Sequence, residues 1–179
     1  RELLIEYKVK NIVLDPVMIS KSGYYLLKPE AIEELKKLIK IVDIVTPNIP
    51  EAEELSNMKI TCQEEMMEAA LKINKLGAKN VLVKGGHRCN DATDILYYDK
   101  KFITLEGKRI STKNTHGTGC TLSSAIASYI AKGYSIEDSV KLSKEYITVA
   151  IKNSFPIGHG VGPVGHFIDL YERANLSYK

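Results

Sequence analysis

Short runs of β-branched residues alternate with helical patterns in the first half of the chain, and this alternation restricts the possible folds most. The runs Asn11–Val17, Ile41–Val45 and Val81–Val83 have the composition of buried strands. Between them, apolar residues recur at helical spacing behind Pro29 and again up to Gly77. Strands that alternate with helices usually form parallel sheets, because each helix carries the chain back across the sheet. The sequence therefore predicts an α/β fold, a layered sandwich with a largely parallel central sheet.

The second half of the chain has a different pattern, with a hairpin followed by helices. The elements expected after the first strands are a short helix near Pro50, a capping box of Thr61 and Glu64, a hairpin around Asp99-Lys100-Lys101, a helix from Leu122 to Gly133, a helix from Ser135 to about Asn153, and a short last helix behind the glycine-rich stretch Gly158–Pro163. No linker or repeat interrupts this order, so we expect residues 1–179 to belong to one domain.

The composition excludes several classes of protein. Hydrophobic residues make up 44% and charged residues 26% of the 179 residues, and the net charge of +3 is spread along the chain. This balance argues against a disordered chain and against extensive nucleic-acid binding. No apolar run reaches the ~18 residues of a membrane span. The three cysteines form no CxxC pair, which favours reduced thiols in a cytoplasmic protein.

A glycine-containing loop, His116–Cys120, is the most informative polar segment. Gly117 and Gly119 permit tight turns, so consecutive backbone N–H groups can converge on one point. A helix follows at once, and its first N–H groups and its dipole favour an anion. Thr118 adds a hydroxyl donor. The alternative is a glycine-bearing turn that only precedes a buried helix.

Cys120 is predicted to lie in the first turn of that helix. A thiolate is stabilised at a helix N-terminus, so we expect the pKa of this thiol to fall below its free value of about 8.5. The alternative is that Cys120 is a small buried apolar residue, as many free cysteines are.

Polar residues follow the other predicted strands at the edge where ligands bind in α/β sheets. Asp15, Asn48 and Glu51 offer the oxygen ligands that Mg²⁺ prefers, and Lys84 is a candidate contact for a phosphate or nucleotide. Each has a simpler interpretation. Asn48 and Glu51 have the spacing of a helix capping box, Asp15 precedes a proline in a turn, and Lys84 could be a solvated lysine.

Six motifs together resemble a known family. They are DPVM (Asp15–Met18), KSG (Lys21–Gly23), TPNIPEAEEL (Thr46–Leu55), VKGGH (Val83–His87), TKNTHGTGCTLSSAIA (Thr112–Ala127) and GHGVGPVGHF (Gly158–Phe167). In this order they are similar to hydroxymethylpyrimidine/phosphomethylpyrimidine kinases, the thiamine branch of the ribokinase-like superfamily. The resemblance implies a ribokinase-like three-layer α/β/α sandwich. It also implies two successive phosphorylations, of 4-amino-5-hydroxymethyl-2-methylpyrimidine and then of its monophosphate, with ATP and Mg²⁺.

The resemblance also implies roles for individual residues. The loop Gly117–Cys120 corresponds to the anion hole of the family, with Cys120 at the catalytic position and close to the substrate. Val17 is expected near the pyrimidine. Asn48 and Glu51 correspond to the element that organises Mg²⁺ and its waters.

Two further residues of the motifs correspond to the nucleotide side of the family's site. Asp15 would face the phosphates and the metal, so Asp15 and Glu51 are the expected Mg²⁺ ligands, partly through water. Lys84 would help to hold the nucleotide. We also expect a homodimer.

The family has roughly another third of its chain before the position of Arg1. We therefore expect residues 1–179 to be the C-terminal two-thirds of a kinase domain that is truncated at its N-terminus, with an exposed sheet edge. The isolated chain would then be a kinase or a non-catalytic nucleotide-binding fragment. A pyridoxal-type vitamin kinase is the alternative within the class. A hydrolase or transferase with a covalent Cys120 is the alternative outside it, although position 126 carries Ile126 rather than the arginine of a Cys-x5-Arg phosphatase loop.

Overall fold

The computed structural model describes residues 1–18, 26–86 and 91–176. Within the chain, contacts divide into two compact units, Arg1–Arg109 and Ile110–Lys179, and each unit is described by itself. The predictions for Lys21–Gly23, His87 and Cys89 lie outside the described residues.

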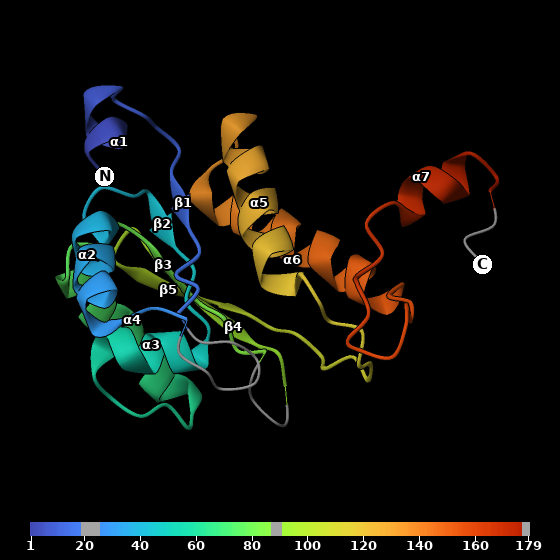
Figure 1. Ribbon diagram of the computed structural model, residues 1–179, viewed down its shortest axis with the longest axis horizontal. Helices are drawn as coiled ribbons and strands as arrows, with labels where there is room; N and C mark the ends of the chain where they lie inside the picture. The colour runs from blue at the N-terminus through green and yellow to red at the C-terminus, as the bar shows by residue number, and fades with distance from the viewer. Residues whose placement is uncertain (19–25, 87–90, 177–179) are drawn as a thin grey trace. The chain divides into compact units, whose positions relative to one another are not determined.

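The first unit is built on a five-stranded sheet (Figure 1). Its elements are α1 (Glu2–Glu6), β1 (Val13–Leu14), α2 (Pro29–Ile39), β2 (Ile44–Val45), α3 (Ile49–Ser56), α4 (Gln63–Lys75), β3 (Val81–Val83), β4 (Asp94–Tyr98) and β5 (Lys101–Leu105). The strands lie in the order β1-β2-β3-β4-β5. The first three are parallel, and β4 and β5 add an antiparallel hairpin. The expected α/β sheet with a parallel core is confirmed.

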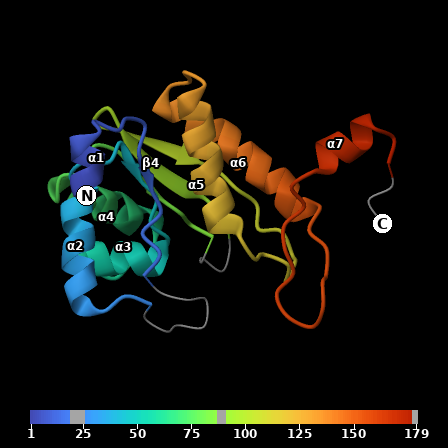
Figure 2. The ribbon, with the colours of Figure 1, turned by 45° about the horizontal axis from the view of Figure 1, so that its top comes forward.

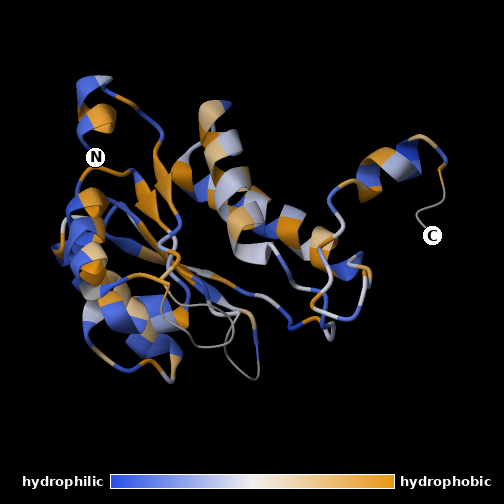
Figure 3. Ribbon diagram, viewed as in Figure 1, coloured by the Kyte–Doolittle hydropathy of each residue, from blue (hydrophilic) through white to orange (hydrophobic). Residues whose placement is uncertain are grey.

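Helices α2, α3 and α4 cover one face of this sheet (Figures 1 and 2). Val81 and Val83 of β3 belong to the core under these helices, together with Met66 and Ile73 of α4. Leu82 alternates with the two valines and therefore faces the other side of the sheet. Figure 3 shows β1 and β2 in the hydrophobic colour. Both residues of β2 are buried, whereas both residues of β1, at the edge of the sheet, are only partly buried.

Local signals place most element ends, but the predicted cap of α4 was wrong. Pro29 begins α2, and Asp99 and Lys100 adopt left-handed conformations in the hairpin turn between β4 and β5. The capping box at the start of α4, however, uses Cys62 and Glu65 instead of Thr61 and Glu64. Adjacent glutamates offer two possible registers. The Glu65 carboxylate is the one that accepts from the N–H of Cys62, at 3.2 Å.

The second unit contains α5 (Thr118–Ala131), α6 (Ile136–Lys152) and α7 (Ile168–Arg173). Ser135 caps α6 through its Oγ, which accepts from the Asp138 N–H at 3.0 Å, as the sequence predicts. Helix α5 begins at Thr118, four residues before the expected Leu122, so its first turn contains Cys120. Within the described ranges, no helix combines the length and the apolar character needed to cross a membrane.

Candidate active site

The glycine loop His116–Cys120 forms the N-terminus of α5. Gly117 is the N-cap residue and is left-handed, with φ 82° and ψ 0°. This conformation is strained for residues with a Cβ, which explains the glycine. The first helical bond follows directly, because the Thr121 N–H donates to the Gly117 carbonyl at 2.9 Å. The Thr118 hydroxyl donates to the Thr115 carbonyl at 2.9 Å, and this hydrogen bond stabilises the turn before the helix.

Two backbone donors in this loop have no acceptor among the described residues. They are the N–H groups of Gly119 and Cys120, in the first turn of a 14-residue helix. Such groups at a helix N-terminus bind anions, since the aligned peptide dipoles add to their partial positive charge. The loop therefore has the chemistry of a phosphate-binding site.

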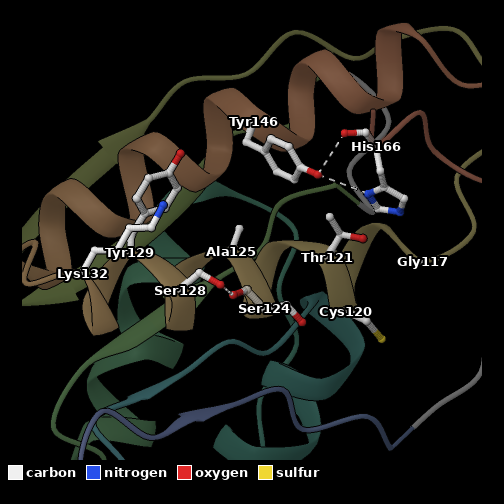
Figure 4. Close-up of a pocket in the computed structure, with 10 residues that line it drawn as sticks. All are labelled: Gly117, Cys120, Thr121, Ser124, Ala125, Ser128, Tyr129, Lys132, Tyr146 and His166. Carbon is white, nitrogen blue, oxygen red and sulfur yellow. Dashed lines mark hydrogen bonds between the residues drawn. The ribbon is translucent and has the colours of Figure 1, made fainter. Parts of the chain in front are cut away.

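Cys120 is exposed at this end of the helix. This excludes the interpretation of Cys120 as a buried apolar residue. It lines a groove of about 520 Å³ that runs along α5 from Gly117 to Lys132 (Figure 4). On the α6 side of the groove, the Tyr146 hydroxyl lies 3.4 Å from both Nδ1 and the carbonyl oxygen of His166.

A second group of site residues lies in the unit of residues 1–109. Asp15 follows β1 and Lys84 follows β3, so the parallel strands bring both side chains to the same edge of the sheet. Lys84 Nζ lies 2.8 Å from Asp15 Oδ1, and each side chain is only 13% exposed. The Thr46 hydroxyl lies 3.4 Å from the same Asp15 oxygen. Lys84 is thus a largely buried partner of Asp15 and not a solvated surface lysine.

Glu51 completes this group, and we call Asp15, Glu51 and Lys84 the charged cluster. The capping interpretation of Asn48 and Glu51 is confirmed. The Glu51 N–H donates to Asn48 Oδ1 at 2.9 Å, and the Asn48 N–H donates to Glu51 Oε2 at 2.8 Å. Glu51 is nevertheless only 2% exposed, so it is more than a surface cap.

The electrostatic surroundings of Glu51 link the three charges. Burial raises the pKa of the Glu51 carboxyl. The Asn48 N–H and the positive charge of Lys84 partly offset this rise, whereas the negative charge of Asp15 adds to it. A carboxylate that is buried next to a second carboxylate gains from any further positive charge. The charged cluster is therefore suited to a cation.

Lys84 is held in place by its backbone. Its N–H donates to the Pro47 carbonyl at 2.8 Å, and the next N–H, of Gly85, donates to Asp94 Oδ1 at 2.8 Å. A Cβ on Gly85 would collide with the carbonyl oxygen of Thr93. Only glycine fits at this close approach of two backbone segments.

The residues present fit Mg²⁺. This ion takes oxygen ligands and usually keeps several waters, so that one or two carboxylates and the substrate phosphates suffice. Asp15 and Glu51 supply two carboxylates, and Lys84 supplies a charge for phosphate. No group of three or more His, Cys, Asp or Glu side chains suited to a metal occurs in the described part of the chain. The assignment of Asp15 and Glu51 to a metal remains a prediction, as does that of the half-exposed Val17 to the substrate.

The motif residues thus fall into two sets, one in each unit, and the structure brings together the members of each set. Sequence reasoning missed one buried residue near the glycine loop, Asn114, which is 7% exposed. Its side chain accepts from the Gly162 N–H at 3.2 Å, across 48 positions of sequence. The only local signal was the polar character of the loop Thr112–Gly119.

Comparison with known proteins shows which family the chain is similar to. Residues 1–165 match the family described as phosphomethylpyrimidine kinase. A thiamine biosynthesis bifunctional protein of Geobacter sulfurreducens is 46% identical over 167 residues, which are 92% of this chain and 34% of that protein. A hydroxymethylpyrimidine/phosphomethylpyrimidine kinase of Haemophilus influenzae is 41% identical over 172 residues, 93% of this chain and 64% of the relative. The chain thus spans between about a third and 64% of the length of these relatives.

Solved structures show the same relationship. A phosphomethylpyrimidine kinase from Clostridium difficile is 52% identical with a TM-score of 0.73, over 84% of this chain and 61% of the other. An ADP complex of Bacillus subtilis pyridoxal kinase is 37% identical with a TM-score of 0.85, over 94% of this chain and 64% of the other. These likenesses confirm the ribokinase-like α/β fold that the motifs imply. By its motifs, its glycine loop and its match over residues 1–165, the chain belongs to the phosphomethylpyrimidine kinase family.

Proposed function

We propose that the protein transfers the γ-phosphoryl group of ATP to 4-amino-5-hydroxymethyl-2-methylpyrimidine and then phosphorylates the resulting monophosphate, in thiamine biosynthesis. The observation that carries the proposal is the pair of N–H groups of Gly119 and Cys120, which have no acceptor among the described residues, at the N-terminus of α5 with an exposed thiol beside it. The relatives named for this activity support the substrate. The family match crosses the boundary at Arg109, which supports one kinase domain formed by both units.

Phosphoryl transfer has a loose transition state, so positioning and charge neutralisation contribute more than strong basicity. The N–H groups of Gly119 and Cys120 would stabilise the charge on the transferred group. Lys84 would bind a nucleotide phosphate, while Asp15 and Glu51 would hold Mg²⁺ directly or through water. The metal would supply further neutralisation of phosphate charge. In the first step, the Cys120 thiolate would accept the proton of the substrate hydroxyl.

An aspartate at position 120 could also accept the proton of the hydroxyl in the first step. The second step gives a reason why a cysteine fits better there. The acceptor is now a phosphate monoester, which is already anionic at neutral pH because its second pKa is about 6. An ionised aspartate ~4 Å away would oppose it by roughly 4 kcal/mol at an effective dielectric of about 20. A thiol can stay neutral and avoid this repulsion. We therefore propose that Cys120 permits both phosphorylations at one site.

A coupled kinase assay with the pyrimidine alcohol and Mg-ATP tests the proposal. Cys120→Ala should lower turnover by roughly 10²-fold or more, the usual contribution of a proton acceptor. Cys62→Ser is the matched control, because Cys62 is a free cysteine at the start of α4, and it should keep wild-type turnover. Calorimetry with Mg-ATP separates the alternatives, because binding without turnover would indicate a nucleotide-binding module. A covalent adduct on Cys120 would indicate a hydrolase or transferase.

A pyridoxal kinase is the second candidate, favoured by the structural likeness to the Bacillus subtilis pyridoxal kinase. Both substrates are hydroxymethyl heteroaromatic rings, so the same phosphate machinery serves either of them. Turnover of the two alcohols under the same conditions decides between them. The homodimer and the cytoplasmic location remain predictions, and sedimentation of the purified protein checks the first.

A further inference from the structure

The glycine-rich stretch Gly158–Pro163 has no role in the proposed mechanism, yet it packs along the segment that leads into the glycine loop. His116 and Pro163 form a parallel β-bridge, and the His116 N–H donates to the Gly162 carbonyl at 3.0 Å. The Gly162 N–H in turn donates to Asn114 Oδ1 at 3.2 Å. Gly162 therefore accepts a hydrogen bond from His116 and donates one to Asn114, the two residues that flank Thr115.

Further bonds extend this contact toward the end of α6. The Asn114 N–H donates to the Thr112 hydroxyl at 3.1 Å, and that hydroxyl lies 3.1 Å from Ser154 Oγ. We call the bonds from Thr112, Asn114 and His116 to Ser154 and Gly162 the clasp. Asn114 and Gly162 are both buried, so breaking the hydrogen bond between them would leave buried polar groups without a partner and lower the stability of the clasp.

The space around Gly162 shows that the clasp needs a glycine at this position. A Cβ there would lie 2.5 Å from Asn114 Oδ1 and would also collide with the carbonyl oxygen of Phe155. At Gly160, in the same stretch, a Cβ would have no other atom within 4 Å. The two glycines therefore form a matched pair, since only one of them is required by contact.

We propose that Asn114 and Gly162 are positioning residues for phosphoryl transfer, which hold the backbone before α5 so that the N–H groups of Gly119 and Cys120 converge. This inference rests on the proposed function. Its physical basis is sequence proximity. His116, the bonded residue, directly precedes the N-cap Gly117. A shift of His116 therefore moves the first turn of the helix, and misplacement by about 1 Å can cost 10²-fold in rate.

Amide hydrogen exchange tests the clasp without any activity. In Asn114→Ala, the His116 and Gly162 amides should exchange roughly tenfold faster, because a buried hydrogen bond is lost. Gly162→Ala should have the same effect, and Gly160→Ala should exchange like the wild type. Asn114→Asp keeps an acceptor oxygen and should restore most of the protection. Unchanged exchange in Asn114→Ala would show that no clasp exists.

Kinetics then test the positioning role. Asn114→Ala and Gly162→Ala should lower kcat at least tenfold while the KM for the pyrimidine stays within about threefold. Gly160→Ala should keep both constants. Faster exchange with wild-type kcat would reduce the clasp to a structural feature and overturn the proposal.

A wild-type protein without phosphoryl transfer would refute the proposed function and, with it, the role of the clasp in transfer. Whether the clasp positions the N–H groups of Gly119 and Cys120 for a bound phosphate is then judged by calorimetry with Mg-ATP. Asn114→Ala should bind Mg-ATP at least tenfold more weakly than the wild type. Equal affinities, or a wild type that binds no Mg-ATP, would overturn the positioning role.

Discussion

Replacing Glu51 with glutamine distinguishes the destabilising effect of its buried charge on folding from the role of that charge in metal binding. The folded protein raises the pKa of Glu51, mainly by burial. Between the unfolded value of 4.5 and the raised value, the folded state binds more protons than the unfolded state. The free energy of unfolding therefore falls as pH increases through this window. Above it, ionised Glu51 costs about 1.4 kcal/mol for each unit by which folding raises its pKa.

Glu51→Gln keeps the shape and the capping acceptor, since a glutamine at this position also closes a capping box. The variant should approach the wild type in stability as the pH falls to 4.5 and below, where the Glu51 carboxyl becomes protonated in the unfolded chain as well as in the folded one. At pH 7 the variant should be more stable than the wild type, by about 1.4 kcal/mol for each unit by which folding raises the pKa of Glu51. In the kinase assay, the same variant should lose most Mg-dependent turnover, because a metal ligand at Glu51 needs the negative charge.

Urea unfolding at pH values from 4 to 8 measures this effect. Glu145→Gln, at an exposed position of α6, controls for the loss of a carboxylate from the unfolded chain. A Glu51→Gln variant that is less stable than the wild type at pH 7, or that runs parallel to it over the whole range, would falsify the linkage argument. Increased stability with full Mg-dependent turnover would show that Glu51 is not a metal ligand. It would leave the linkage argument intact.

Three other substitutions have defined outcomes. Lys84→Met leaves the carboxylate of Asp15 without its ion-pair partner, so it should lower the free energy of unfolding by about 2 kcal/mol and weaken Mg-ATP binding, measured by urea unfolding and calorimetry. Gly85→Ala forces a Cβ into a backbone carbonyl and should cost at least about 1–3 kcal/mol in urea unfolding, whereas Gly86→Ala has free space and should cost little. Cys120→Asp should reduce the second phosphorylation roughly 10²–10³-fold more than the first, from the repulsion of about 4 kcal/mol, measured by separate assays of the two acceptors.

Each of these predictions can be contradicted. Unchanged Mg-ATP affinity in Lys84→Met would exclude a phosphate role for Lys84. Equal stability of the Gly85→Ala and Gly86→Ala variants would show that the close backbone approach is not maintained in solution. Equal losses of both phosphorylations in Cys120→Asp would exclude charge repulsion as the reason for the cysteine.

Local sequence signals predicted the elements well where one interaction dominates. The strand Val81–Val83, the cap at Ser135 and the turn at Asp99 all follow from neighbours within a few residues, and all agree with the structure. The start of α4 was misplaced because two adjacent glutamates compete for one cap. The start of α5 was set too late, because Thr118 and Gly119 carry none of the apolar periodicity that marked the helix from Leu122.

The sequence by itself determined the fold class, the family and the glycine loop, because these depend on patterns and motifs that are contiguous in the chain. Only the tertiary structure decided how site residues far apart in sequence interact. Asp15 meets Lys84 across 69 positions, and Asn114 meets Gly162 across 48. Burial of Glu51, which raises its pKa, likewise depends on the packing of strands and helices around it. Periodicity and spacing report which face a residue occupies, whereas ion pairing and desolvation depend on distances that exist only in the folded chain.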